Sequence, residues 1–71
     1  MRAREQKLID DGFELISYEY DGDAQRCAAR IEARGLQWKL LREKSDTRGL
    51  KMFSVWAKGA SGIPKYELFP A

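Results

Sequence analysis

Apolar and polar residues follow two different patterns along this chain, and the changes between them predict its elements. Residues 13–20 (FELISYEY) are rich in aromatic and β-favouring residues and have glycines near both ends, which is typical of a strand. Residues 36–58 contain two further strand-like runs, LQWKLLREK and LKMFSVWAK, on either side of the polar segment SDTRG. We interpret this stretch as a β-hairpin whose turn contains Gly49.

Two other segments have the pattern of helices. Residues 2–11 (RAREQKLIDD) contain good helix formers, and Gly12 follows where a helix commonly ends in a glycine. In residues 24–34 (AQRCAARIEAR), small apolar residues recur at helical spacing, at Ala24, Cys27, Ala28 and Ile31. Such a narrow stripe of small side chains predicts close packing of this main helix against a sheet.

The order helix–strand–helix–strand–strand predicts an α+β fold in a single small domain, residues 1–71. We interpret residues 21–23 (DGD) as a turn, with Asp23 as the N-cap of the main helix. A right-handed β-α-β crossover would place strand 13–20 parallel to strand 36–44, which gives a three-stranded mixed sheet with the C-terminal β-hairpin packed against the main helix. Residues 59–71 begin with a loop composition and are expected to form a loop or flap, with an additional short strand near their end as an alternative.

The hairpin strands carry large apolar side chains on both faces, so both faces are expected to meet another surface. One face should take the main helix. The other needs the N-terminal helix, the C-terminal tail, a second copy of the chain or a partner. We expect Ile16 and Tyr18 to be largely buried. At least one of Trp38 and Trp56 should lie in the core, and the other is a candidate exposed anchor.

Size and composition narrow the class of protein. A chain of 71 residues buries only about 60% of the surface that it exposes when unfolded, so its stability is expected to be marginal. With one cysteine and no histidine, it cannot form an intramolecular disulfide or a zinc site of the usual kind. We therefore expect no metal and no cofactor, and homodimerisation stays open as a source of stability.

The location of the protein is an expectation of the same kind. No apolar run approaches the roughly 20 residues that a membrane span needs. The first residues, MRAREQKLIDD, lack the apolar stretch of a secretory signal. These features predict a cytoplasmic protein with no membrane partner.

Candidate catalytic groups are scarce in this sequence. The absence of histidine removes the commonest general base near neutral pH. Cys27 lies on the apolar stripe without a histidine to activate it, so we expect a buried structural thiol. Segments 45–49 and 59–62 do not match a phosphate loop or a dinucleotide fingerprint. We therefore expect a protein that is not an enzyme and has no catalytic residues.

Charge is distributed unevenly along the chain. Residues 1–23 hold three bases and seven acids, a net charge of −4, whereas residues 24–71 hold ten bases and four acids, a net charge of +6. The bases gather on the hairpin and along one side of the main helix, which indicates a partner-binding or nucleic-acid-binding surface. The candidate residues are Arg26, Arg30, Arg34, Lys39, Arg42, Lys44, Arg48 and Lys51. Neutralisation of this surface by the acidic segment after folding is the alternative.

These features favour a non-catalytic binding module that acts stoichiometrically on a macromolecular partner, either a protein or a nucleoprotein complex. Its eight aromatic residues and seven arginines belong to the residue types that dominate protein interfaces. The alternative is direct binding of DNA or RNA through the basic hairpin and the arginine stripe of the main helix. A two-stranded ribbon fits the major groove, and lysines and arginines at its turn neutralise phosphates.

In size and general style the chain is similar to the small accessory proteins of bacteriophages and mobile elements, which include anti-CRISPR proteins and other inhibitors of host defence. The resemblance consists of a short single domain, a mixed α/β pattern and no catalytic or metal signature. It implies an inhibitor that covers the surface of a partner, and it assigns no site residues.

Overall fold

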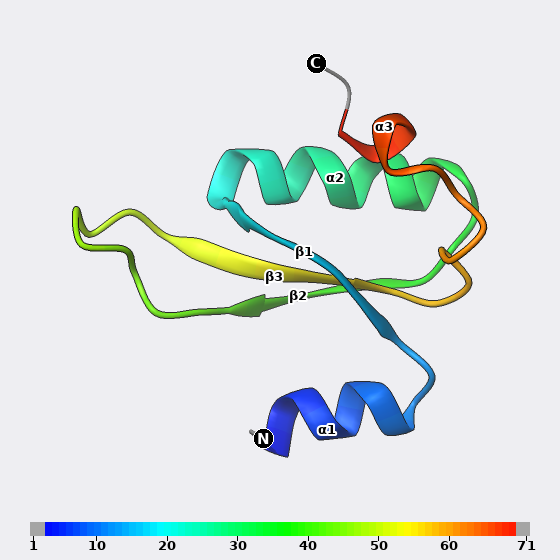
Figure 1. Cartoon of the computed structure of the whole chain (residues 1–71), viewed down its shortest axis with the longest axis horizontal. Helices are drawn as coiled ribbons and strands as arrows, with labels where there is room; N and C mark the ends of the chain where they lie inside the picture. The colour runs from blue at the N-terminus through cyan, green and yellow to red at the C-terminus, as the bar shows by residue number, and fades with distance from the viewer. Residues whose placement is uncertain (1–2, 70–71) are drawn as a thin grey trace.

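The computed structural model describes residues 3–69, and over that range the chain forms three strands and three helices (Figure 1). The elements are α1 (Ala3–Asp10), β1 (Glu14–Tyr20), α2 (Asp21–Ala33), β2 (Trp38–Arg42), β3 (Met52–Ala57) and α3 (Lys65–Leu68). The predicted α+β class, the first two helices and the three strands are confirmed. The alternative of a short C-terminal strand is wrong, because that segment contains α3.

The three strands form one sheet in the order β1-β3-β2, and both pairs of neighbours are antiparallel. The predicted mixed sheet is therefore wrong, although β1 and β2 do run in the same direction on either side of β3. The run from Ser54 to Ala57 is buried throughout. A strand that is apolar on both faces belongs in the middle of a sheet, and this explains why β3 separates the two strands joined by α2.

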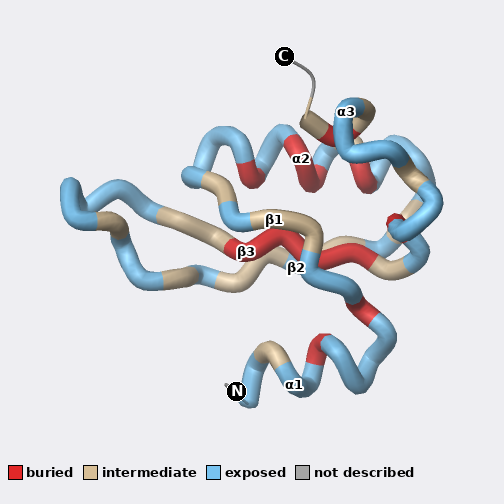
Figure 2. The backbone as a smooth tube through the Cα atoms, viewed as in Figure 1, coloured by how far each residue is buried: buried red, intermediate tan, exposed pale blue. Residues whose placement is uncertain are grey.

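The main core lies between the sheet and α2, where Figure 2 shows the buried positions on the side of the helix that faces the strands. Its buried members come from α2, β3 and the C-terminal segment: Ala24, Cys27, Ile31, Val55, Ala57, Ala60 and Leu68. Complete burial of Ile31 or Val55 contributes roughly 1.5–3 kcal/mol each. The stripe of small residues predicted for α2 is confirmed.

The second face of the sheet is covered in part by α1, which lies on the opposite side from α2 (Figure 1). Its core is small and consists of Leu8, Phe13 and Trp56, with the half-buried Leu41 against them. Leu8 is the one buried side chain among the described residues of α1. Trp56 is thus the predicted core tryptophan, whereas Trp38 is half-buried.

A register shift in β1 decides which of its side chains are covered. Leu15 is opposite Trp56 and Ser17 is opposite Val55, so Ile16 has no partner in the ladder, as in a β-bulge. Ile16 is half-buried against the α2 core. Tyr18 is 51% exposed. The expectation that Tyr18 is largely buried is therefore wrong.

Helix α2 begins earlier than its sequence suggests. Asp21 is already helical, and Tyr20 occupies the N-cap position without a side-chain cap. The predicted turn over residues 21–23 and the predicted N-cap at Asp23 are both wrong. The Asp21 amide donates a hydrogen bond to the Lys51 carbonyl over 3.1 Å, and two acids in the first turn suit the positive end of the helix dipole. These features allow β1 to continue directly into α2.

The C-terminal segment folds against α2. Leu68 is 1% exposed and belongs to the main core. Glu67 forms an ion pair with Arg34, and the Leu68 carbonyl accepts a hydrogen bond from Arg30 over 3.5 Å.

Among the described residues, 3–69, no helix is long and apolar enough to cross a membrane.

Candidate partner-binding site

The segment that joins β2 to β3, residues 43–51, extends beyond the sheet (Figure 1). We call it the hairpin loop. It carries Lys44, Arg48 and Lys51, three of the eight basic residues singled out in the sequence. A loop of this length is expected to be mobile unless specific contacts hold it, so its own contacts determine whether it can present a defined surface.

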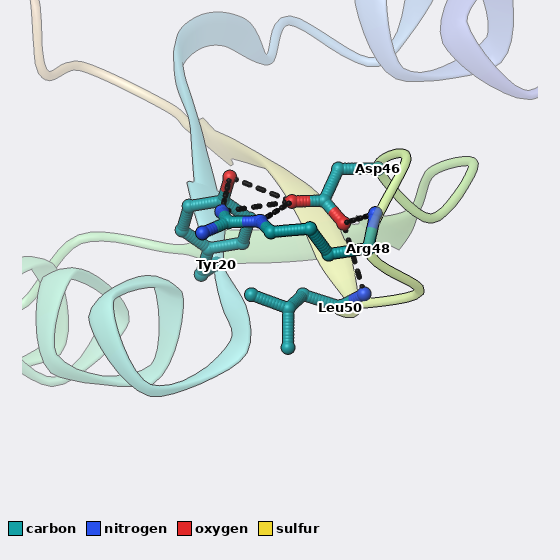
Figure 3. A network of polar contacts seen from close by, with 4 residues as sticks. All are labelled: Tyr20, Asp46, Arg48 and Leu50. Atoms are coloured by element: carbon teal, nitrogen blue, oxygen red, sulfur yellow. Dashed lines mark hydrogen bonds and ion pairs between the residues drawn. The ribbon is translucent and has the colours of Figure 1, made fainter.

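A polar network holds the hairpin loop against the end of β1 (Figure 3). The Tyr20 hydroxyl donates a hydrogen bond to Asp46 Oδ2 over 2.8 Å and accepts one from Arg48 Nη2 over 2.7 Å. Arg48 also donates to Asp46 Oδ2 from Nε, over 3.2 Å, and from Nη2, over 3.0 Å. Its guanidinium carbon lies 5.5 Å from the centroid of the Tyr20 ring, within cation–π distance.

The second oxygen of Asp46 fixes the backbone of the loop. Asp46 Oδ1 accepts hydrogen bonds from the amides of Arg48, over 2.9 Å, and Leu50, over 3.0 Å. The Gly49 amide donates to the Asp46 carbonyl over 2.9 Å, and Gly49 has a φ of +82°, a conformation that glycine adopts without strain. One side chain therefore organises the turn that the sequence placed around Gly49.

The same contacts set the protonation of Asp46. Loss of hydration opposes its ionisation, but the hydrogen bonds from the Leu50 amide, Tyr20 and Arg48 outweigh that effect and lower the pKa of Asp46 to about 2. The hydrogen bond to Asp46, followed by the contact with Tyr20, raises the pKa of Arg48 above its ordinary value. The network is thus held in its charged form at neutral pH.

This arrangement exposes an apolar side chain among charges. Leu50 is 46% exposed and lies between Arg48 and Lys51 in the loop. Sequence reasoning placed Leu50 on a strand face and missed its role in the loop. It also missed Tyr20, because no local pattern links that residue to the hairpin loop.

Three of the predicted basic residues point their charge to solvent. The side chains of Lys39, Lys44 and Lys51 are exposed, and within residues 3–69 none of these three ammonium groups takes part in a hydrogen bond or ion pair. Arg42 is different, because it donates to the Glu43 carbonyl over 2.7 Å and to Ser45 Oγ over 3.2 Å. It therefore supports the base of the hairpin loop while remaining exposed.

The arginine stripe of α2 is engaged mainly within the chain. Arg26 forms an ion pair with Asp23, and Arg34 forms one with Glu67. The C-terminal end of α2 lies at the far end of the sheet from the hairpin loop (Figure 1). The structure therefore does not bring Arg34 to the loop, and the eight predicted residues do not form one continuous surface.

Neither the single thiol of the chain nor its acidic side chains form a reactive site within the described residues. Cys27 is fully buried, and burial, followed by the negative charge of Glu19 and against the opposing effect of Arg30, raises the pKa of its thiol to about 11. Within the part of the chain that the structure describes, no three histidine, cysteine or acidic side chains gather as a metal site would require. The hairpin loop, by contrast, has a fixed shape and presents positive charge and the exposed side chain of Leu50.

Comparison of the chain with protein-family models, with curated proteins and with solved structures finds no match in any of the three.

Proposed function

We propose that this protein is a non-catalytic binding module that acts stoichiometrically on a macromolecular partner, a protein or a nucleoprotein complex, through its hairpin loop. The observation that carries the proposal is the Tyr20–Asp46–Arg48 network, which fixes the loop before any partner arrives. A binding loop that is already ordered loses less conformational entropy on association than a mobile one.

The loop favours a protein surface over bare nucleic acid. Leu50 supplies an exposed apolar side chain, a group that gains free energy when a pocket buries it and gains little against phosphates. The charge of Arg48 is already matched by Asp46, which leaves Lys44 and Lys51 as the cations available to a partner. The complementary surface is therefore an apolar pocket bordered by acidic groups.

Direct binding of DNA or RNA is the second candidate, and the exposed lysines support it. Within the described residues, the ammonium groups of Lys39, Lys44 and Lys51 make no hydrogen bond or ion pair, so their charges are available to phosphates. Titration with duplex and single-stranded oligonucleotides at two salt concentrations tests this candidate. Affinity that falls steeply with salt would favour it over a protein partner, and no binding at low salt would remove it.

The leading proposal is tested by affinity capture from extracts of the source cells, with quantitative mass spectrometry. The wild-type chain is compared with a double variant, Leu50→Ala with Lys51→Glu, and with the matched control Lys65→Glu. Lys65 is an exposed base of α3, an element that packs on α2. We expect one protein or complex to be retained by the wild type and the control and lost by the double variant.

Stoichiometric action adds a second requirement. Titration of the captured partner should reach its end point at about one chain per binding site. An identical set of captured proteins for the wild type and the loop variant would contradict the proposal. Arg48→Glu is less informative, since it would also break the contacts of Arg48 with Tyr20 and Asp46.

A further inference from the structure

A groove of about 400 Å³ lies between α1 and β1, on the side of the sheet opposite α2. Its apolar lining includes Ile9, Leu15, Tyr18 and Trp56. It is separate from the hairpin loop, and none of the eight basic residues predicted from the sequence lines it. We call it the α1–β1 groove.

Most of the side chains that line the α1–β1 groove are apolar. Ile9 is 44% exposed, Leu15 is 42% exposed and Tyr18 is 51% exposed. Trp56, by contrast, is 3% exposed and contributes to the small core beneath α1. An exposed apolar surface with a concave shape is characteristic of a site that another molecule covers.

The charges beside the groove specify what can cover it. The charged side chains among its lining residues are Glu5 and Glu14, both acidic, and one cation is near, because Lys58 Nζ lies 5.1 Å from the centroid of the Phe13 ring. The bases of α1, Arg4 and Lys7, line a different hollow on the side of the helix that faces β2. Residues 1–23, which supply nearly all of the groove, carry a net charge of −4. The electrostatic complement of this surface is a cation placed next to an apolar group.

We propose that the α1–β1 groove docks a segment of a protein partner in which large apolar side chains lie next to lysine or arginine, such as one face of a basic amphipathic helix. The apolar groups enter the groove against Leu15, Tyr18 and Trp56, and the cations pair with Glu5 and Glu14. The hairpin loop is complementary to acidic partners, so the two surfaces select opposite chemistries. This inference does not depend on the function proposed for the loop.

Selection from a displayed library of random peptides tests the groove directly, with the whole immobilised chain as the target. We expect the enriched peptides to combine lysine or arginine with leucine, isoleucine or an aromatic residue. A synthetic copy of the best peptide should shift the backbone amide resonances of residues 9–18. Enrichment of acidic or uncharged peptides, or of none, would overturn the proposal.

Matched variants separate the groove from the rest of the surface. Tyr18→Ala and Glu14→Lys change exposed groups that line the groove, and each should weaken the peptide by about threefold to tenfold. Tyr66→Ala removes a tyrosine that is 74% exposed on α3 and should leave the affinity unchanged. Lys51→Glu in the hairpin loop should not weaken it either. Equal affinity for wild type, Tyr18→Ala and Glu14→Lys would show that the peptide binds elsewhere.

A second copy of the chain is the competing occupant, and light scattering distinguishes it. We expect the free protein to be monomeric at the concentrations used for binding. A dimer that Leu15→Ala converts to monomer would assign the groove to self-association and refute the proposed partner.

Discussion

The hydroxyl of Tyr20 donates a hydrogen bond to Asp46 Oδ2 over 2.8 Å, although the two residues are 26 positions apart in the chain. Tyr20 ends β1, whereas Asp46 belongs to the loop between the other two strands. The loop is therefore secured to a strand that does not take part in its hairpin. This contact makes the shape of the proposed binding surface depend on the assembly of the whole sheet.

Replacement of Tyr20 by phenylalanine should loosen the hairpin loop while preserving the fold. The change removes the hydroxyl that bonds to both Asp46 and Arg48. Because the site is exposed to solvent, we expect a loss of about 0.5–1.5 kcal/mol in the free energy of unfolding, measured with urea. Hydrogen exchange at the amides of Arg48 and Leu50 should become faster.

Tyr18→Phe is the matched control for that substitution. Tyr18 lies in the same strand, is exposed, and makes no hydrogen bond through its hydroxyl within residues 3–69. Its replacement should leave both stability and amide exchange unchanged. If the two variants behave alike, the network does not order the loop.

Asp46 should give the protein a characteristic loss of stability in acid. Its pKa of about 2 in the folded state lies below the ordinary value of 3.8, so ionised Asp46 favours the folded state. This contribution is complete above about pH 4 and is lost as the pH falls through the pKa of the folded state. Titration of the Asp46 carboxyl carbon by NMR should show the depressed pKa. In Asp46→Asn, the part of the acid destabilisation due to this group should disappear, and an Asp46 pKa near 4 would contradict the network.

Ser54 should be essential to the packing around Trp56. The serine is fully buried in β3, accepts a hydrogen bond from Trp56 Nε1 over 2.8 Å and donates one to Glu43 Oε2 over 2.9 Å. Ser54→Ala leaves the buried indole N–H without this acceptor, so we expect a loss of about 1–3 kcal/mol in the free energy of unfolding. Ser61→Ala, at an exposed position, should change it by less than about 0.5 kcal/mol. Equal stability of the two variants would refute this assignment.

Cys27 should be nearly inert in the folded protein. With a pKa of about 11 in place of 9.0, its thiol has about a hundredfold smaller thiolate fraction at pH 8 than an ordinary cysteine. Alkylation by iodoacetamide should therefore be at least about 100-fold slower in buffer than in denaturing urea. Rapid alkylation of the folded chain would contradict burial of Cys27.

Because the pKa of Cys27 is higher in the folded state than in the unfolded state, the free energy of unfolding should also decline as the pH rises from about 9 towards 11.

Much of the fold follows from local patterns in the sequence. The stripe from Ala24 to Ile31 identified the buried face of α2, and the two apolar runs around the SDTRG segment identified the hairpin. The order of the strands was harder to predict. A crossover through α2 makes β1 and β2 run in the same direction, and this holds both when they are neighbours and when β3 lies between them. The large apolar side chains on both faces of β3, interrupted by Ser54, were the available signal that it belongs in the centre.

The candidate site was less accessible to sequence reasoning. Basic residues were visible as a group, but their availability depends on partners that folding brings near, such as Glu67 for Arg34. Tyr20 and Asp46 meet only because β1 lies beside β3 and the loop folds back towards it. The α1–β1 groove depends on the register shift at Ile16 and on the position of α1 against the sheet. The pattern of apolar and polar residues in β1 predicts neither of these two features.

The register shift at Ile16 also bears on how the protein behaves at high concentration. Strand β1 forms one border of the sheet, and a straight border would offer a second molecule a template for strand addition. The unmatched residue interrupts that template halfway along, and the like charges of Glu14 and Glu19 discourage two such borders from meeting. We therefore expect the same irregularity that leaves Tyr18 open to solvent to hinder fibrillar self-association.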